Sequence, residues 1–525
     1  MKRKISLLLA LVMVLVMALS ACGTPANNNS ANNSANNNNT TPEPVQEDKH
    51  LNVAIYWNAT LDTMNSWGGW WTMRYGVGET LLTMNAKMEL EECLADSYQV
   101  VDSQTFKFHI RQGVKFSNGE LMTPKHVAES IKRIAEGNSR GGNLKLASAE
   151  VDGEYVIFKT TEPYSAFPFM LTEPMCIIVN TDHDMTKYNT EPICTGPYKV
   201  IGHVPDEKWE LEANEYYWKG VPKIKYITNY NIGADTRIQA MMSNQIDMAY
   251  SPSTSTLALI EGSDTYKMVS AVGTRESDIA INCREGHPTA DKNLRLALAY
   301  SLRRDVLAQI SGNGTSQPLS KPFPDSTGYD MKSVTGPDYD LAKAKECLEK
   351  AGYKDTDGNG YVEKDGKELV LKILISSTSG TAVFQSMIDQ WKEVGIHVEL
   401  DPMENVSDKR KSGDFDILGN AGWQTMNNGD GQSYMTNRWS QAGPDNYAGY
   451  YSEEFEAVMK KINETFDLKE RAKYFTDAAQ IIADDCPAIF YAATANYDVI
   501  NTKVLSNFTI YPIDYYVIDN TWEMK

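Results

Sequence analysis

The chain has 525 residues, of which 42% are hydrophobic and 10% aromatic, and it carries a formal net charge of −19. This composition excludes a wholly disordered chain and a collagen-like fibre, and at about 150 residues per domain the length allows about three domains with real cores. The negative charge, which no basic stripe interrupts, argues against nucleic-acid binding.

The first segment of the chain has the pattern of an export signal. Three basic residues, 2–4 (KRK), precede seventeen uncharged and mostly apolar residues, 5–21. A membrane span is the alternative, and this length lies at its lower limit. The run ends in 19–23 (LSACG), which resembles the lipobox of bacterial lipoproteins. The resemblance implies that residues 1–21 are removed and that Cys22 takes a diacylglycerol as a thioether, whereas a plain secretory signal leaves no anchor.

Residues 22–49 form an Asn-rich stretch that also contains Ser, Thr, Ala and Pro. Such a segment has little apolar surface to bury, so we expect a disordered linker between the lipid and the folded body. No later stretch of the sequence is apolar for long enough to cross a bilayer. The sequence therefore predicts an extracytoplasmic protein that is lipid-anchored to the cell membrane.

Strands and turns dominate the first half of the body. Apolar and polar residues alternate over 105–110, as in a half-buried strand. Thr123 and Pro124 begin a helix that extends through Ile134, because proline favours the first helical turn. The 90–190 region is rich in strands and has the character of an added module. Further strands are expected at 51–57, 114–116, 154–158, 209–212, 224–228 and 246–249, and a helix at 235–244.

From about residue 290 onward, helices and strands alternate as they do in α/β proteins. An apolar period of 3.6 predicts one helix over 294–307 and another over 341–351. A strand, a helix and a strand are expected next, at 369–375, 382–394 and 397–400. This half of the body is therefore predicted to be an α/β lobe.

The chain lacks the short motifs of common catalytic and metal sites. It has no Gly-rich phosphate loop, no His-Glu-x-x-His helix and no Gly-x-Ser-x-Gly elbow, and its seven histidines are scattered singly. The segment 355–360 (DTDGNG) begins like a calcium loop, but Gly366 stands where a glutamate is needed, which favours a turn. Six widely spaced cysteines follow Cys22, and we expect free, mostly buried thiols. The sequence thus predicts no catalytic residue, no metal site and no cofactor.

Six blocks along the body resemble the peptide/nickel/opine class of extracellular solute-binding proteins, which serve ABC importers. The resemblance extends from about residue 51 to 522. Each block is weak alone, but six in family order behind a lipobox identify the chain as a member of this class. The blocks are 94–98 (LADSY) with 106–119 (FKFHIRQGVKFSNG), 195–199 (TGPYK), 214–223 (NEYYWKGVPK), 235–247, 294–304 and 339–353.

The resemblance implies an α/β, two-lobed periplasmic-binding-protein-like fold of type II, in its large three-domain variant, with a cleft between the lobes. Lobe I is expected to comprise 50–85, 190–275 and 497–525, with an additional domain, 86–189, inserted in it, and lobe II to comprise 276–496. The lobes close on a ligand about hinge strands. The implied partners are a small-molecule or peptide ligand and ABC permease subunits with their ATPases, and the implied state is a monomer that is not an enzyme.

Many peptide-binding members of this class resemble one another in placing an aspartate shortly after a Gly-Trp pair, where it holds the ammonium group of the ligand. Here Gly422 and Trp423 form that pair, and the aspartate position falls on Met426. Asp430 is a possible substitute. A buried ammonium without a carboxylate is costly, which weakens the prediction of a free-amine peptide. We expect Trp423 and Met426 to contact the ligand.

Three further residues are candidate ligand contacts. Residues 114–120 and the helix after them resemble the nickel-binding branch, and Arg140 aligns with an arginine that grips the carboxylates of a chelated metal there. The second such arginine falls near Glu173, no matching histidine is found, and Arg140 as an exposed loop residue is the alternative. Trp70 and Trp71 lie in a segment that lines the cleft in relatives, where they either stack on a ligand or form lobe-interface core.

The leading hypothesis is a substrate-binding lipoprotein of an ABC importer that takes up an oligopeptide or a related small solute. A receptor for chelated nickel is the alternative within the class, and a receptor that senses a peptide without importing it is another. From a different class, a secreted lipoprotein hydrolase would need two suitably spaced carboxylates, and the sequence singles out no such pair.

Overall fold

A computed structural model of the protein describes residues 49–419 and 422–525. These residues belong to one compact unit, Asp48–Lys525. The predicted export signal 1–21, Cys22 and nearly all of the predicted linker 22–49 lie outside the described residues. None of the helices in the two described ranges has the length and hydropathy that a bilayer crossing requires.

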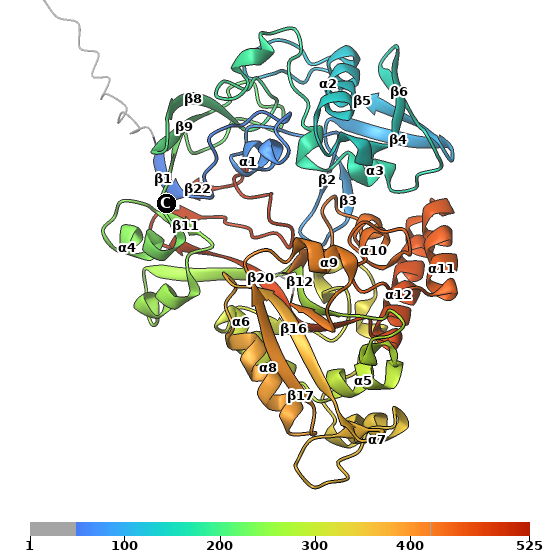
Figure 1. Ribbon diagram of the computed structural model, residues 1–525. Coiled ribbons are helices and arrows are strands. Elements are labelled where there is room, and N and C mark those ends of the chain that lie inside the picture. The colour runs from blue at the N-terminus through green and yellow to red at the C-terminus, as the bar shows by residue number, and fades with distance from the viewer. Residues whose placement is uncertain (1–48, 420–421) are drawn as a thin grey trace, which may run out of the picture. The chain divides into compact units, whose positions relative to one another are not determined.

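One mixed sheet of twelve strands extends through the unit (Figure 1). Its two longest strands, β12 (Tyr266–Ile281) and β20 (Ala488–Asn501), pair antiparallel over most of their length and connect the two halves of the sheet. Along the sheet the strands are β17 (His397–Met403), β16 (Val370–Ser376), β18 (Ile417–Gly419), β12, β20, β11 (Met248–Tyr250), β1 (His50–Ala54), β10 (Tyr226–Tyr230), β9 (Lys208–Ala213) and β8 (Tyr198–Val204), with β13 (Gln317–Pro318) paired to β20 and β19 (Trp423–Gln424) paired to β12.

A separate four-stranded antiparallel sheet lies between β3 and β8 in the chain, with the order β4 (Ala95–Asp102), β5 (Thr105–Ile110), β7 (Tyr155–Thr160) and β6 (Leu146–Asp152). Alternate residues of β5 are buried, as its sequence pattern predicts. The helix predicted from Pro124 is α2 (Pro124–Gly137), whose first turn is closed by a reciprocal capping box between Thr123 and His126. The apolar faces of the sheet and of α2 form one core.

The predicted α/β region has its own core around the parallel strands β16, β17 and β18. The helix expected over 294–307 is two helices, α5 (Lys292–Tyr300) and α6 (Arg304–Gly312). The prediction of one helix is wrong because the backbone at Arg303 is extended, with ψ at 95°, and separates the two helices. The helices expected at 341–351 and 382–394 are present as α7 (Leu341–Lys350) and α8 (Ala382–Lys392).

The prediction of a strand at 114–116 is also wrong. Its backbone bonds go from Phe116 N–H to Glu120 O and from Met122 N–H to Val114 O, so a tight turn closes after a single bridge. The remaining α-helices are α1 (Gly68–Arg74), α3 (Phe167–Met170), α4 (Arg237–Met242), α9 (Ser407–Ser412), α10 (Gln432–Trp439), α11 (Glu453–Glu464) and α12 (Leu468–Asp485). The remaining strands form antiparallel pairs: β2 (Leu82–Met84) with β3 (Leu90–Glu92), β14 (Glu363–Lys364) with β15 (Lys367–Glu368), and β21 (Leu505–Ser506) with β22 (Glu523–Met524).

The largest core joins β1, β9, β10 and β11 to α1, α10, α11 and α12, so apolar packing continues past β12 and β20. The described cysteines all have free thiols and all but Cys283 are buried, in agreement with the sequence. The domain boundaries given above stay a prediction.

Candidate functional site

Helix α1 carries two of the predicted ligand contacts, Trp70 and Trp71. A β-carbon on Gly69 would lie 2.2 Å from the carbonyl oxygen of Pro174, so the glycine permits this close approach. Trp70 is 5% exposed and meets Tyr515 edge to face, with ring centroids 5.2 Å apart. Trp71 is half-buried. Neither indole nitrogen has a hydrogen-bond partner among the described residues.

Asp514 links α1 to the long strand β12. At the end of α1, the Arg74 Nε donates to the Asp514 carbonyl oxygen at 2.9 Å, and its Nη2 lies 3.3 Å from Asp514 Oδ2. From β12, Arg275 Nη2 approaches the same Oδ2 at 3.5 Å. Two guanidinium groups thus converge on one carboxylate. The Arg74 guanidinium also lies 5.3 to 5.8 Å from the ring centroids of Tyr56, Trp70, Tyr250 and Trp71.

Trp423 is held next to β12 by strand pairing. It lies on β19, directly opposite Glu276 of β12. A β-carbon on Gly422 would lie 2.6 Å from the Glu276 carbonyl oxygen, so a side chain there would disturb the pairing. The Arg438 guanidinium of α10 lies 4.3 Å from the Trp423 ring centroid, a cation–π distance. The ring is half-buried, and its Nε1 has no partner in the described part of the chain.

Beneath Trp423, two carboxylates of β12 lie close to one guanidinium. Arg438 forms an ion pair with Asp278, and Glu276 Oε1 accepts a hydrogen bond from the Tyr434 hydroxyl at 3.1 Å. Glu276 and Asp278 are both 0% exposed. Burial raises the pKa of Glu276 well above its ordinary value, and the charge of Asp278 adds to this rise. The charge of Arg438 acts in the opposite direction and lowers the pKa. Glu276 Oε2 and Arg438 Nη1 have no partner within the described ranges.

Arg140 lies beside Glu173, the position where the resemblance placed a second arginine. Its Nη2 forms an ion pair with the Glu173 carboxylate, and its guanidinium carbon lies 3.7 Å from the Trp67 ring centroid. The side chains of Arg140 and Glu173 are 14% and 2% exposed. Burial raises the pKa of Glu173, and the Arg140 charge opposes this rise. Because the Trp67 ring meets Trp70 edge to face at 5.1 Å, this ion pair adjoins α1.

The two candidate residues after Trp423 have different surroundings. Met426 is 1% exposed and packs in the largest core. Asp430, the possible ammonium partner, is engaged by Arg471: the Arg471 Nη1 pairs with its Oδ2, and Nη2 donates to its Oδ1 at 3.0 Å. Arg471 Nη2 also donates to Gln432 at 2.7 Å. Both oxygens of Asp430 are therefore already bound by the chain itself.

The structure connects Trp70 and Trp71 to the strand that holds Trp423 through the Arg74–Asp514–Arg275 link. Sequence reasoning identified Arg140 but missed the other charged members of this group, because residues so far apart in the chain meet only through the register of β12. The available signal was the acidic pair Glu276 and Asp278 beside an apolar run. We call the group the arginine–tryptophan cluster and define it as Trp70, Trp71, Arg74, Arg140, Arg275, Glu276, Trp423, Arg438 and Asp514.

The arginine–tryptophan cluster contains an unusual concentration of buried polar atoms without partners among the described residues. Most buried polar groups in proteins are hydrogen-bonded, so such a concentration is typical of a surface that a ligand or water completes. The donors are Trp70 Nε1, Trp71 Nε1, Trp423 Nε1, Arg140 Nη1 and Arg438 Nη1, and the carboxylate oxygens are Glu276 Oε2 and Asp514 Oδ1.

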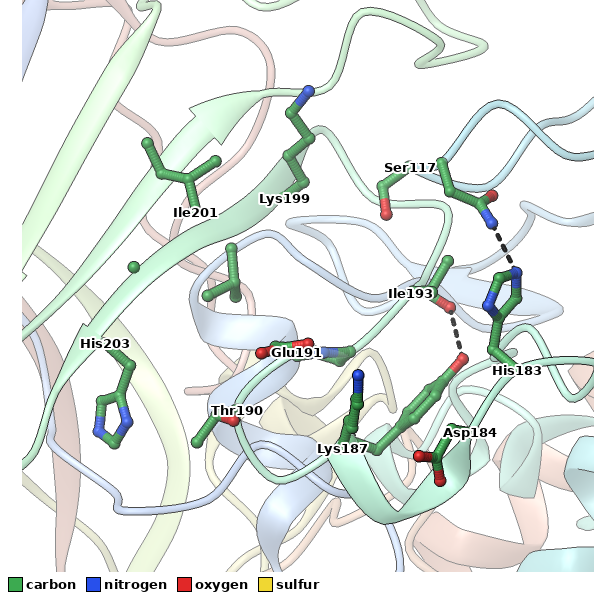
Figure 2. Close-up of a pocket in the computed structure, with 15 residues that line it drawn as sticks. Ser117, His183, Asp184, Lys187, Thr190, Glu191, Ile193, Lys199, Ile201 and His203 are labelled. Carbon is green, nitrogen blue, oxygen red and sulfur yellow. Dashed lines mark hydrogen bonds between the residues drawn. The ribbon is translucent and has the colours of Figure 1, made fainter.

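A cavity of about 610 Å³ lies beside the edge strand β8 (Figure 2). In Figure 2, Lys199 and Ile201 extend from β8, and His183 lies across from them. Lys199 Nζ lies 3.2 Å from a Glu212 oxygen and His183 Nε2 lies 3.0 Å from a Glu120 oxygen, so these groups have partners on the chain. None of the predicted ligand contacts lines this cavity.

A second cavity, of about 460 Å³, is lined by Glu79. The buried Glu79 carboxylate accepts hydrogen bonds from Thr195, Tyr217 and Trp218 at 2.9 to 3.0 Å. Its two oxygens are thus satisfied by the protein, in contrast to those of Glu276.

The predicted turn over 355–360 brings three acids together. Ligand oxygens of Asp355, Asp357 and Glu363 lie within 4.8 Å of one another, close enough to hold a metal ion. The Asp355 carboxylate accepts the backbone N–H groups of Gly358 and Gly360 at 2.7 and 3.1 Å, which is how polar turns close without an ion. The segment therefore has the turn that its sequence favours.

Comparisons with known proteins identify related chains of similar length. The family model "Bacterial extracellular solute-binding proteins, family 5 Middle" matches residues 89–446, more than half of the chain. The nickel-binding protein NikA of Staphylococcus aureus is 24% identical over 456 residues, covering 85% of this chain and 89% of that protein. The glutathione-binding protein GsiB of Pectobacterium atrosepticum is 26% identical over 457 residues, covering 82% and 85%.

Among solved structures, the crystal structure of a nickel ABC transporter protein from Bacillus halodurans superimposes with a TM-score of 0.81. It is 23% identical in sequence, and the superposition covers 90% of this chain and 99% of that one. The likeness confirms the predicted α/β, two-lobed periplasmic-binding-protein-like fold.

Proposed function

The chain belongs to the bacterial extracellular solute-binding proteins of family 5, and from this premise we propose that it captures a solute outside the membrane and delivers it unaltered to an ABC permease. The similar proteins are named for nickel and for glutathione, so the family accommodates solutes of different kinds. Transport by this chain requires binding and release, and no covalent step. We propose that it is not an enzyme.

The observation that carries the proposal is the group of unpartnered polar atoms in the arginine–tryptophan cluster. The donors come from α1, β19, α10 and Arg140, and the acceptors come from β12 and Asp514. A solute that bonds both to α1 and to β19 and α10 binds more tightly when these elements are close together. It favours that arrangement of the protein by this difference in affinity. Trp70, Trp71, Arg140 and Trp423 are the proposed contacts, with Met426 supporting the Trp423 segment from the core.

The chemistry of these atoms favours a solute rich in hydrogen-bond acceptors. Indole and guanidinium groups only donate, and guanidinium groups pair with carboxylates in a bidentate manner. An oligopeptide, with its carbonyl groups and terminal carboxylate, has the required acceptors. A metal chelate with carboxylates is the second candidate, favoured by the free Nη1 of Arg140 above the Trp67 ring.

The direct test is to identify what the protein binds. Protein purified from its native host would be denatured, and the released solute identified by mass spectrometry. Adding that solute back to empty protein should raise stability by RT ln(1+[L]/Kd), about 2.7 kcal/mol at a hundredfold excess over Kd. Catalytic accumulation of a product from peptide or sugar pools would contradict the proposal and favour a hydrolase.

Replacing Trp423 with Ala should weaken binding of the identified solute about 30-fold, because a central aromatic contact contributes 2 kcal/mol or more. The melting temperature of the empty protein should stay nearly unchanged, since the ring is only half-buried. Calorimetric titration and thermal unfolding measure the two effects. The control is Tyr451→Ala, a 58% exposed aromatic outside the cluster, which should change neither. Equal loss of binding and of stability would mean that Trp423 is packing.

Membrane attachment depends on Cys22 in this proposal. Cys22→Ala should move the protein from the membrane fraction to the medium, because the thioether to diacylglycerol cannot form and each buried CH₂ of the acyl chains is worth about 0.8 kcal/mol. Fractionation followed by immunoblotting measures the shift. Cys283→Ala, which removes a thiol from the folded unit, is the control and should stay attached. Retention of the Cys22 variant in membranes would contradict the lipid anchor.

A further inference from the structure

Glu276 differs from Asp514, the other carboxylate of the cluster, in the charged groups that surround it. Asp514 lies between two guanidinium groups, Arg74 and Arg275. Glu276 instead shares Arg438 with a second acid, Asp278. The cluster therefore has a base-rich end at α1 and an acid-rich end at β19.

One oxygen of Glu276 is available for bonding. Oε1 accepts from the Tyr434 hydroxyl, while the fully buried Oε2 has no partner in the described part of the chain. A buried carboxylate oxygen without a donor is costly, and a cation is its strongest partner. Trp423 lies directly across the strand pair from Glu276, so the carboxylate adjoins a proposed ligand contact.

We infer that Glu276 binds an ammonium group of the solute, and that the solute is a zwitterion whose carboxylate faces the end of the cluster at α1, where Arg140 Nη1 has no partner among the described residues. This inference rests on the proposed function. The position after the Gly-Trp pair, Met426, offers no charge, and Asp430 is bound on both oxygens by Arg471. The carboxylate for the ammonium group thus comes from β12 instead of from the loop after Trp423.

Proton release gives the inference a second readout. The raised pKa of Glu276 favours its neutral form before a cation arrives, and an ammonium group beside it favours the ionised form. Binding should therefore release a proton, and affinity should rise with pH until Glu276 is ionised. The charged and titratable groups that face it are Asp278 on β12, Tyr434 and Arg438 on α10, and Tyr491 on β20.

The test uses a casein hydrolysate, which contains free amino acids and peptides, and a portion of the same hydrolysate acetylated with acetic anhydride. Immobilised full-length protein is exposed to each pool, and retained species are identified by mass spectrometry. We expect wild type to retain free-amine species and to bind their acetylated forms about 30-fold or more weakly. Glu276→Gln should lose this preference. A retained free-amine species, titrated in buffers of different ionisation enthalpy, should release a proton on wild type and none on the variant.

Glu79→Gln is the matched control, because it neutralises a buried glutamate whose oxygens already have donors, and it should keep the preference for free amines. Unfolding curves verify that both variants fold, and if Glu276→Gln does not, Glu276→Asp, which keeps the charge but shortens its reach, takes its place with the same expected loss. Equal retention of acetylated species by wild type, or an undiminished preference in the Glu276 variant, would overturn the inference. Retention of nothing from either pool would also overturn it, while the receptor role is judged separately by the co-purified solute.

Discussion

Replacing Asp430 with Asn is expected to lower the free energy of unfolding by about 3–5 kcal/mol, because it leaves the guanidinium of Arg471 buried without its carboxylate. The two side chains are 1% and 2% exposed, and the pair is bidentate. Arg471 also bonds to Gln432 and to the Ile462 carbonyl oxygen, so it cannot turn to solvent without breaking further bonds. Chemical denaturation monitored by tryptophan fluorescence measures the change.

The matched control for this substitution is Asp152→Asn. Asp152 pairs with Lys107 at 2.9 Å, but their side chains are 59% and 30% exposed, so loss of the pair should cost about 1 kcal/mol or less. A double variant, Asp430→Asn with Arg471→Met, should recover part of the stability because no buried charge remains unpaired. Equal effects of the Asp430 and Asp152 substitutions would contradict the structural role and return Asp430 to the candidates for ligand binding.

Local periodicity was sufficient to predict those elements whose burial follows from their own sequence. The alternation of β5 and the amphipathic pattern of α2 are examples, since each packs one face against one core. Neither of the long strands β12 and β20 was predicted. Their polar residues, including Glu276 and Asp498, are buried by partners from distant segments, so the alternation that marks a half-buried strand is lost.

The candidate site was predictable in its aromatic part and at Arg140. Trp70, Trp71 and Trp423 each follow a glycine or a Gly-Trp pair, a pattern visible in the sequence. The charges that accompany them come from segments separated by hundreds of residues, such as Arg74 with Asp514. Which arginine meets which carboxylate depends on the register of β12 against β19 and on the close approach at Gly69.

The pairing of Arg140 with Glu173 likewise could not be predicted from the sequence alone. Removal of Arg140 should have the second large effect on the free energy of unfolding. Arg140→Met is expected to cost about 3–5 kcal/mol at pH 7, because the buried Glu173 carboxylate would lose its charged partner. Burial already raises the pKa of Glu173 above its value in the unfolded chain, and loss of Arg140 raises it further. A group with a raised native pKa binds its proton more readily in the folded state, so the loss should shrink as the pH falls from 7 to 5.

A second substitution separates the structural role of Arg140 from its proposed role in binding. Arg140→Met with Glu173→Gln removes both charges, so stability should largely recover and its dependence on pH between 5 and 7 should weaken. If Arg140 Nη1 also grips a carboxylate of the solute, binding of the identified solute should remain weak in this stable double variant, measured by calorimetric titration. Recovery of both stability and affinity would leave Arg140 as the partner of Glu173 alone, because a lost ligand contact cannot be restored by neutralising a buried acid.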